Sequence, residues 1–181
     1  MMKRSNLILL GVLGAIFLYF TTLQFSTHNY VRKGVIQDSG AIISETRMVA
    51  DFRSVHIKDK MKVYFKQDSI SKITVEAPEN FMPHIKTIVN QETLMIEKTR
   101  SMNMNDTIKV FISNHHLDTV KIGSSAYFKT VGLVTGKELI LEFRDESTGD
   151  LEVTYEMITC KTRSDATIKL TGNSKEINFL D

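Results

Sequence analysis

The sequence predicts an all-β fold of short strands that follows one N-terminal apolar helix, and a β-solenoid is the favoured arrangement of the strands. Three observations support this prediction. An uncharged run lies near the N-terminus, apolar and polar residues alternate over most of the remaining chain, and a serine-containing unit recurs in the C-terminal half. The 181 residues suit one compact domain plus a short extra segment.

The apolar run extends from Leu7 to Phe25 and follows the basic pair Lys3 and Arg4. At about 1.5 Å per residue, a helix of this length nearly crosses a hydrocarbon core of about 30 Å. A secretory signal peptide also has a basic start and an apolar core, but no good small-x-small cleavage site follows here. We therefore expect residues 1–26 to be an uncleaved signal anchor, with a cleaved signal peptide as the alternative. The nearby basic pair places the N-terminus in the cytoplasm and the rest of the chain outside.

Residues 27–46 show little periodicity and are interpreted as a linker, with one short strand at Ala41–Ser44. From Asp51 onward the apolar period becomes two, which is typical of half-buried strands. About eleven such runs occur. One helical turn is expected at Asn80–Val89, where Pro83 limits its length.

Three segments of the C-terminal half share one pattern, in which a serine is followed two residues later by a small residue and then by an apolar one. They are Ser124–Phe128, Ser147–Leu151 and Ser164–Ile168. A unit of about twenty residues suggests the coil of a β-solenoid. The small residues then lie at tight corners, which are Ala126, Gly149 and Ala166. The repeat alone leaves a sandwich or a barrel open, because β proteins use serine and glycine in turns generally.

Several segments also match a known family. They are the opening Asp51–Ile57, the block Ile73–Asn80, and the runs Ile85–Val89 and Thr93–Ile96. In these the chain resembles the putative auto-transporter adhesin, head GIN domain family of the bacterial cell envelope, found chiefly in Bacteroidota. The resemblance spans about Arg47 to Leu180. Its repeats are poorer in glycine than is usual for the family, since only Gly149 remains at the small positions.

The resemblance implies a right-handed, parallel β-helix-like solenoid over residues 47–181 and no established activity. It also implies a place in the cell envelope, as a single-pass inner-membrane protein or, if the leader is cleaved, in the periplasm or at the surface. Fold analogy alone is weak support for a function, which depends on the residues of a site.

The residues favour a protein that is not an enzyme and has no cofactor and no metal. The formal net charge is +2 and the charges interleave, which argues against a nucleic-acid partner. The single Cys160 cannot form an internal disulfide and is interpreted as an inward-facing strand residue. His115 and His116 lack nearby metal ligands at suitable spacing. No catalytic, cofactor-binding or metal-binding residue is therefore predicted.

The leading hypothesis is a non-enzymatic, adhesin-like envelope protein that binds a glycan or a protein, with Leu7–Phe25 in the membrane. One alternative is a carbohydrate-active β-helix enzyme, because acids could align on stacked turns. These acids are Asp145, Glu146, Asp150 and Asp165. Another alternative is a membrane-anchored sensor or scaffold. A second copy could pair with the final run Ile177–Leu180, although a homo-oligomer is not favoured.

Overall fold

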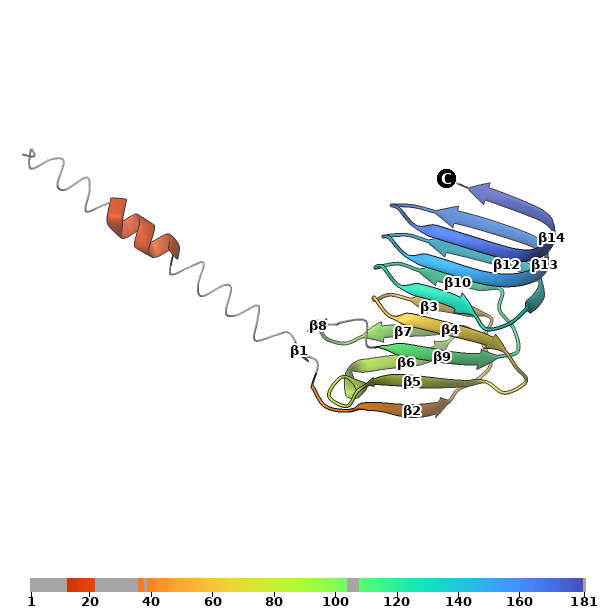
Figure 1. Ribbon diagram of the computed structural model, residues 1–181, viewed down its shortest axis with the longest axis horizontal. Helices are drawn as coiled ribbons and strands as arrows, with labels where there is room; N and C mark the ends of the chain where they lie inside the picture. Colours follow the sequence, from red (N-terminus) through yellow and green to blue (C-terminus); the bar gives the residue numbers. More distant parts are fainter. Residues whose placement is uncertain (1–12, 22–35, 38, 104–107, 181) are drawn as a thin grey trace, which may run out of the picture. The chain divides into compact units, whose positions relative to one another are not determined.

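The computed structural model describes residues 13–21, 36–37, 39–103 and 108–180, and nearly all of its regular structure is β (Figure 1). Residues 13–21 form a helix. The strands are β1 (Ile36–Gln37), β2 (Ile42–Met48), β3 (Ser54–Ile57), β4 (Lys62–Gln67), β5 (Lys72–Pro78), β6 (Ile85–Asn90), β7 (Thr93–Lys98), β8 (Met102–Asn103), β9 (Lys109–Asn114), β10 (Thr119–Ile122), β11 (Tyr127–Thr130), β12 (Val134–Phe143), β13 (Thr148–Thr162) and β14 (Thr167–Leu180). A single 3-10 turn, η1, covers Met82–His84. The prediction of a mostly β protein is confirmed.

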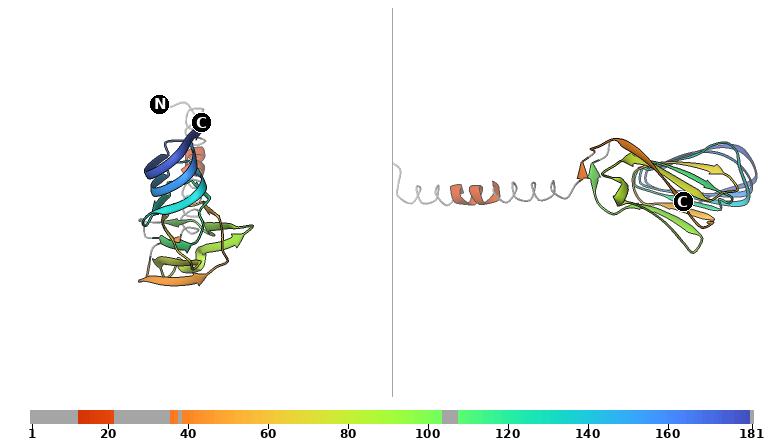
Figure 2. Two further views of the ribbon diagram at one scale, coloured as in Figure 1. Left: turned by 90° about the vertical axis from the view of Figure 1, so that its right-hand side faces the viewer. Right: turned by 90° about the horizontal axis from the view of Figure 1, so that it is seen from below.

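Twelve of the fourteen described strands, all except β1 and β8, form one curled, mixed sheet with the shape of a half-barrel (Figure 2), and β1 pairs with β8. The order of the large sheet is β2-β5-β9-β4-β11-β13-β12-β10-β3-β7-β6, and β14 pairs with β13 outside this path. We call β2, β5, β9, β4, β11 and the first part of β13 the first wall. The second wall holds the last part of β13 with β12, β10, β3, β7 and β6.

The strands near the C-terminus stack in parallel, one coil above the next. Tyr127 of β11 lies beside Thr148 of β13, and Thr148 lies beside Thr167 of β14. The offsets between these partners are 21 residues (148 − 127) and 19 residues (167 − 148). The predicted unit of about twenty residues therefore matches the sequence distance between parallel partners, and we call the chain between two such partners a coil.

The predicted alignment of the small corner residues is wrong in the middle coil. The parallel register places Ser147, not Gly149, beside Ala126 and Ala166, because the amide of Thr148 donates to Ala126 O and that of Thr167 donates to Ser147 O. Gly149 lies two residues further on, inside the strand. A Cβ there would lie 2.6 Å from Cε1 of Phe143, so glycine makes room for this buried ring.

The strands near the N-terminal end of the domain include antiparallel neighbours. The pairs β2–β5, β5–β9 and β6–β7 are antiparallel, so the sheet as a whole is mixed. The helical turn predicted over Asn80–Val89 is wrong in its second half. Only Met82–His84 form a turn, with Pro83 in its first positions, and Ile85 already begins β6. The apolar residues Phe81, Ile85 and Ile88 recur at helical spacing, but the segment from Ile85 pairs with β7, and this pairing outweighs the helical spacing.

The core lies between the two walls and consists of the inward residues of the alternating strands. Strands β3, β4 and β9 show the expected alternation of buried and more exposed positions. The rings of Phe65 and Phe128 stack with centroids 6.4 Å apart, and both side chains are fully buried. Cys160 is buried on the inward face of β13, as predicted, and burial raises the pKa of its thiol.

The predicted anchor Leu7–Phe25 lies partly outside the described residues, as does most of the predicted linker before Ile36. Within the described part of the chain, no helix has both the length and the apolar character needed to span a bilayer. β2 occupies the end of the stretch interpreted as a linker and pairs with β5. The domain bounds 1–26, 27–46 and 47–181 stay a prediction.

Candidate functional site

The acids considered for glycoside hydrolysis do not form a pair in a cleft. Asp145 and Glu146 lie in the exposed turn between β12 and β13, both with left-handed backbone (φ of 56° and 59°). Asp165 lies at the equivalent place in the next turn, also at positive φ. Asp150 points outward from β13, and its hydrogen bond from Lys129, together with the nearby lysine charges, lowers the pKa of its carboxyl. A general acid in glycoside hydrolysis needs a raised pKa, so this geometry does not support that role.

The adjacent histidines also fail to form a metal site among the described residues. The rings of His115 and His116 meet edge to face, with centroids 4.4 Å apart. They line a hollow of about 640 Å³ together with Gln67 and Asp118. Asp118 is already paired with Arg53 at 2.9 Å. Within the described part of the chain, no three His, Cys, Asp or Glu side chains are placed to hold a metal ion.

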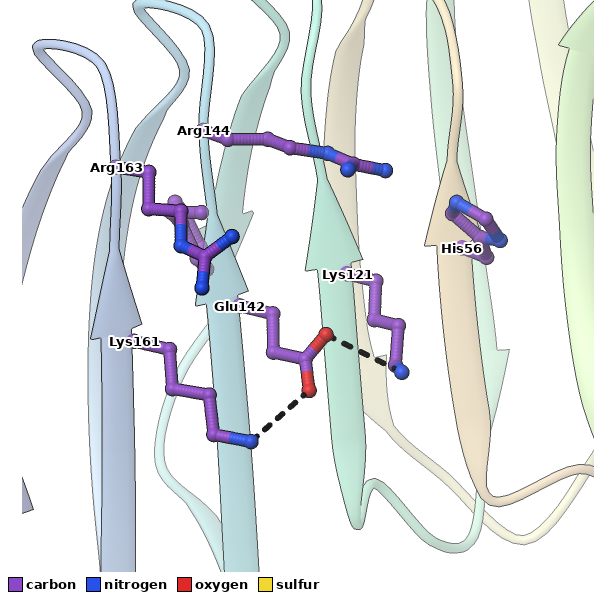
Figure 3. A pocket seen from close by; sticks show the side chains of 7 residues that line it. His56, Lys121, Glu142, Arg144, Lys161 and Arg163 are labelled. Atoms are coloured by element: carbon purple, nitrogen blue, oxygen red, sulfur yellow. Dashed lines mark hydrogen bonds and ion pairs between the residues drawn. The ribbon is translucent and has the colours of Figure 1, made fainter. Parts of the chain in front are cut away.

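A different group of side chains forms a basic hollow on the outer surface of the second wall, and we call it the basic groove (Figure 3). It has a volume of about 260 Å³ and opens to solvent. Phe143 lines it, together with the polar side chains of His56, Lys121, Glu142, Arg144, Lys161 and Arg163. Four cationic side chains and one carboxylate give the groove a formal charge of 4 − 1 = +3 with His56 neutral.

Parallel register brings four of these residues into one row across the wall. His56 of β3 lies beside Lys121 of β10, Lys121 lies beside Glu142 of β12, and Glu142 lies beside Lys161 of β13. These positions alternate with buried residues along each strand, so their side chains point to solvent. Residues that are far apart in sequence therefore face the same hollow because successive coils stack in register.

Glu142 bridges the two lysines of the row. Its carboxylate oxygens lie 3.2 Å from Lys121 Nζ and 3.5 Å from Lys161 Nζ (Figure 3). Burial alone would raise the pKa of this carboxyl, but the hydrogen bonds and charges of the two lysines outweigh burial, and the pKa is lowered. Glu142 is therefore ionised at neutral pH and holds both ammonium groups at the groove.

The two arginines come from equivalent positions of stacked turns. Arg144 and Arg163 each begin the tight turn that follows a strand, and Gly123 holds the same position one coil earlier. A Cβ on Gly123 would lie 3.3 Å from Cγ of Arg144, so the glycine leaves room for that side chain. Figure 3 shows Arg144 extending across β10 toward His56 and Arg163 directed toward Glu142. Arg144 has a long contact with the exposed Asp145, at 4.0 Å, and no described acidic side chain forms an ion pair with Arg163.

The imidazole of His56 lies near several of the positive charges of the groove. Partial burial lowers the pKa of its imidazole, and the nearby charges of Lys58, Arg144 and Lys121 lower it further, while Glu142 opposes them. His56 is therefore neutral at pH 7. The arrangement of two guanidinium and two ammonium groups around one hollow suits an oxyanion, since guanidinium groups bind carboxylate, sulfate and phosphate with paired hydrogen bonds.

The sequence analysis missed this site. Neither the two arginines nor the two lysines of the groove were predicted as site residues from the sequence. The signal exists in the spacing, since Lys121, Glu142 and Lys161 are one coil apart at offsets of 21 and 19 residues. That signal can be used only when the register of the coils is known.

Comparison with known proteins identifies the fold family. A family model described as putative auto-transporter adhesin, head GIN domain, matches residues 51–180. A search of curated proteins returns no match. A putative adhesin from Bacteroides fragilis superposes with a TM-score of 0.74 at 17% identity, over 78% of this chain and 67% of that one.

Two structures from Parabacteroides distasonis are also similar. A putative adhesin has a TM-score of 0.67 at 20% identity and covers 80% of this chain and 71% of its own. A putative lipid binding protein has a TM-score of 0.65 at 16% identity and covers 75% of this chain and 62% of its own. At these identities the likeness concerns the fold alone. Because the family model covers most of the sequence, this chain belongs to the putative auto-transporter adhesin, head GIN domain family.

Proposed function

We propose that this protein is a non-enzymatic, adhesin-like component of the cell envelope that binds an oxyanion-bearing polymer at its basic groove. Its β domain lies outside the cytoplasm in this proposal, and β11 to β14 form the coils of a short right-handed parallel solenoid. Membership of a family described as adhesins supports the location and the binding role. The parallel stacking at offsets near twenty residues supports the solenoid.

The observation that carries the proposal is the surplus of positive charge that strand register gathers in one hollow. Glu142 neutralises one cation and fixes two lysines, and Arg144 and Arg163 add two guanidinium groups from stacked turns. Ordinary surface lysines and arginines are scattered among acids and move freely. Here parallel register gathers four cationic side chains around one hollow, and a single carboxylate, that of Glu142, pairs with two of them, so positive charge is concentrated at one place.

The ligand class follows from the charges. A phosphate or sulfate group on a surface polymer offers several acceptor oxygens to the two guanidinium groups, and repeated groups along the polymer add to the attraction. The adhesin-like role is favoured over the sensor or scaffold, because the groove provides a specific contact with an external molecule. The enzyme alternative lacks support, since the acids Asp145, Glu146 and Asp165 lie on exposed turns.

The test is a binding measurement with the full chain, a glycerol phosphate oligomer and a sulfated oligosaccharide. The double variant Arg144→Gln/Arg163→Gln should lose at least about tenfold in affinity for one of these probes, because two charge-assisted hydrogen-bond donors are removed. Lys86→Gln on β6, which does not line the groove, is a control that removes one positive charge elsewhere and should bind as the parent does. Equal binding by the parent and the double variant, with both folded, would refute the proposal.

A further inference from the structure

The first wall carries a second group of outward side chains with a different chemistry. Strands β9, β4 and β11 lie side by side in parallel, and two consecutive outward positions on each strand form a block of six residues. One row of the block is Lys109, Lys62 and Tyr127, and the other row is Phe111, Tyr64 and Lys129. We call these six residues the aromatic–lysine platform.

The three rings of the platform contact one another at the surface. The rings of Tyr64 and Phe111 stack with centroids 5.1 Å apart, and Tyr127 meets Tyr64 edge to face at 6.4 Å. Phe111 is 36% exposed, while both tyrosines are half-buried. Single exposed apolar residues are common on proteins, but contiguous aromatic surface on the face of a strand often marks an interaction site.

Two lysines of the platform lie close enough to repel each other. Lys62 lies directly beside Lys109 on the neighbouring strand, and like charges at such positions repel. Lys109 has only a long contact with Glu76, at 3.9 Å, and Lys129 is paired with Asp150 at 3.1 Å. Lys62 is half-buried and forms no ion pair with a described acidic residue. An external anion between Lys62 and Lys109 would offset this repulsion.

We propose that the aromatic–lysine platform is a second binding site, which takes a saccharide carrying carboxylate groups, such as a chain of uronic acid residues. A pyranose ring presents apolar C–H groups to the rings of Tyr64 and Tyr127, and the tyrosine hydroxyls remain available for sugar hydroxyls. A uronic acid holds its carboxylate directly on the ring. A sugar residue packed on the two tyrosines therefore brings the carboxylate to Lys62, which lies beside Tyr127 and two residues before Tyr64.

Other ligand classes fit the platform less well. A neutral sugar leaves the Lys62–Lys109 repulsion in place, and an apolar partner would bury lysine charges without pairing them. A bare polyanion makes no use of the three rings. Single-stranded nucleic acid combines rings and charge, but the interleaved charges and net charge of +2 argue against it.

The experiment measures binding of three probes to the full chain by calorimetry. The probes are a galacturonic acid hexamer, its methyl ester and an oligothymidylate. We expect the hexamer to bind and the ester to bind at least about tenfold more weakly, because esterification removes the charge and keeps the ring. Tyrosine fluorescence should also change, since the protein has no tryptophan and two of its five tyrosines belong to the platform.

The variants assign the site. Tyr64→Ala and Lys62→Gln should each weaken hexamer binding about tenfold, whereas Tyr64→Phe, which keeps the ring, should lose much less. Because the basic groove can also take carboxylates, Lys62→Gln is measured in the Arg144→Gln/Arg163→Gln background as well; hexamer binding should persist in the groove variant and fall about tenfold when Lys62→Gln is added, so the platform and the groove are tested separately. Thermal unfolding of each variant shows whether it is folded. If Tyr64→Ala does not fold, Lys62→Gln still tests the site.

Four results would overturn the inference. They are no binding of the hexamer, equal binding of the ester, tighter binding of the oligothymidylate that is lost in Tyr64→Ala, and loss of hexamer binding only in the groove variant. The third result would assign the platform to nucleic acid instead, and the fourth would assign the acidic saccharide to the groove.

Discussion

Glu142→Gln should strengthen oxyanion binding at the basic groove, although it removes two ion pairs. The substitution keeps the shape of the side chain and removes its charge, so the formal charge of the groove rises from +3 to +4. We take a separation of about 6 Å between the Glu142 carboxylate and an oxyanion that contacts Lys121 and Lys161 from the solvent side. Repulsion across that distance is about 0.7 kcal/mol in bulk water and about 1.4 kcal/mol at half that dielectric constant.

Relief of this repulsion predicts roughly three- to tenfold tighter binding of a glycerol phosphate oligomer. Loss of the two partly exposed ion pairs should lower the free energy of unfolding by only about 1 kcal/mol. Calorimetric titration measures the affinity, and urea unfolding measures the stability. The gain in affinity should shrink between about 20 mM and about 150 mM NaCl, because salt screens the repulsion.

The first wall offers a matched control, because Asp150 bridges two lysines in the same way. Its carboxylate lies 3.1 Å from Lys129 and 3.8 Å from Lys169. Asp150→Asn should therefore have a similar small effect on stability and no effect on phosphate binding. Unchanged or weaker phosphate binding by a folded Glu142→Gln variant would show that this reasoning about the groove is wrong, as would equal gains in both variants.

Three further predictions concern protonation and packing. The pKa of His56 is lowered, so the folded state favours the neutral imidazole over the protonated one. Neutral His56 therefore stabilises the fold fully above the ordinary pKa of 6.5, and this stabilisation is lost as pH falls below that value. A bound oxyanion favours the protonated imidazole, so phosphate affinity should rise from pH 7 to about pH 5.5, and His56→Gln should abolish the rise in a calorimetric pH series. Gly149→Ala should cost about 1–3 kcal/mol in urea unfolding, because its Cβ would overlap the Phe143 ring; an unchanged midpoint would contradict the packing described. Asn114→Leu should cost about 3 kcal/mol or more, because Asn114 is fully buried and donates to the carbonyl oxygens of Phe52 and His116; thermal unfolding checks this, and a shift of less than about 2 °C would contradict it.

The periodicity of the sequence predicts the strands well, because alternation records which residues face the core. Val55 and Ile57, for example, are both buried on β3, and the polar residue between them is not. The same reasoning fails at Ile85, where spacing of three residues resembles a helix and pairing with β7 imposes a strand. The residue pattern of a short segment does not include the effect of a hydrogen-bonded strand that is ten or more residues away in the sequence.

The register of the coils is harder to predict, and the basic groove depends on it. Aligning Ser147 with Ser124 shifts the middle coil by two residues relative to the alignment that the structure shows. The true alignment places left-handed turn residues above one another, and Arg144 above Gly123. Serine is a common turn residue and a weak marker of register, so the row that joins Lys121, Glu142 and Lys161 could not be found from sequence.

The measurement that tests the oxyanion-binding proposal most directly is an amide NMR titration of the full chain with the glycerol phosphate oligomer. The account predicts that the largest shifts fall on the groove residues of β3, β10, β12 and β13, centred on Arg144 and Arg163, and that Arg144→Gln/Arg163→Gln removes them. Shifts that centre elsewhere, or that persist in the double variant, would contradict the claim that the basic groove binds an oxyanion.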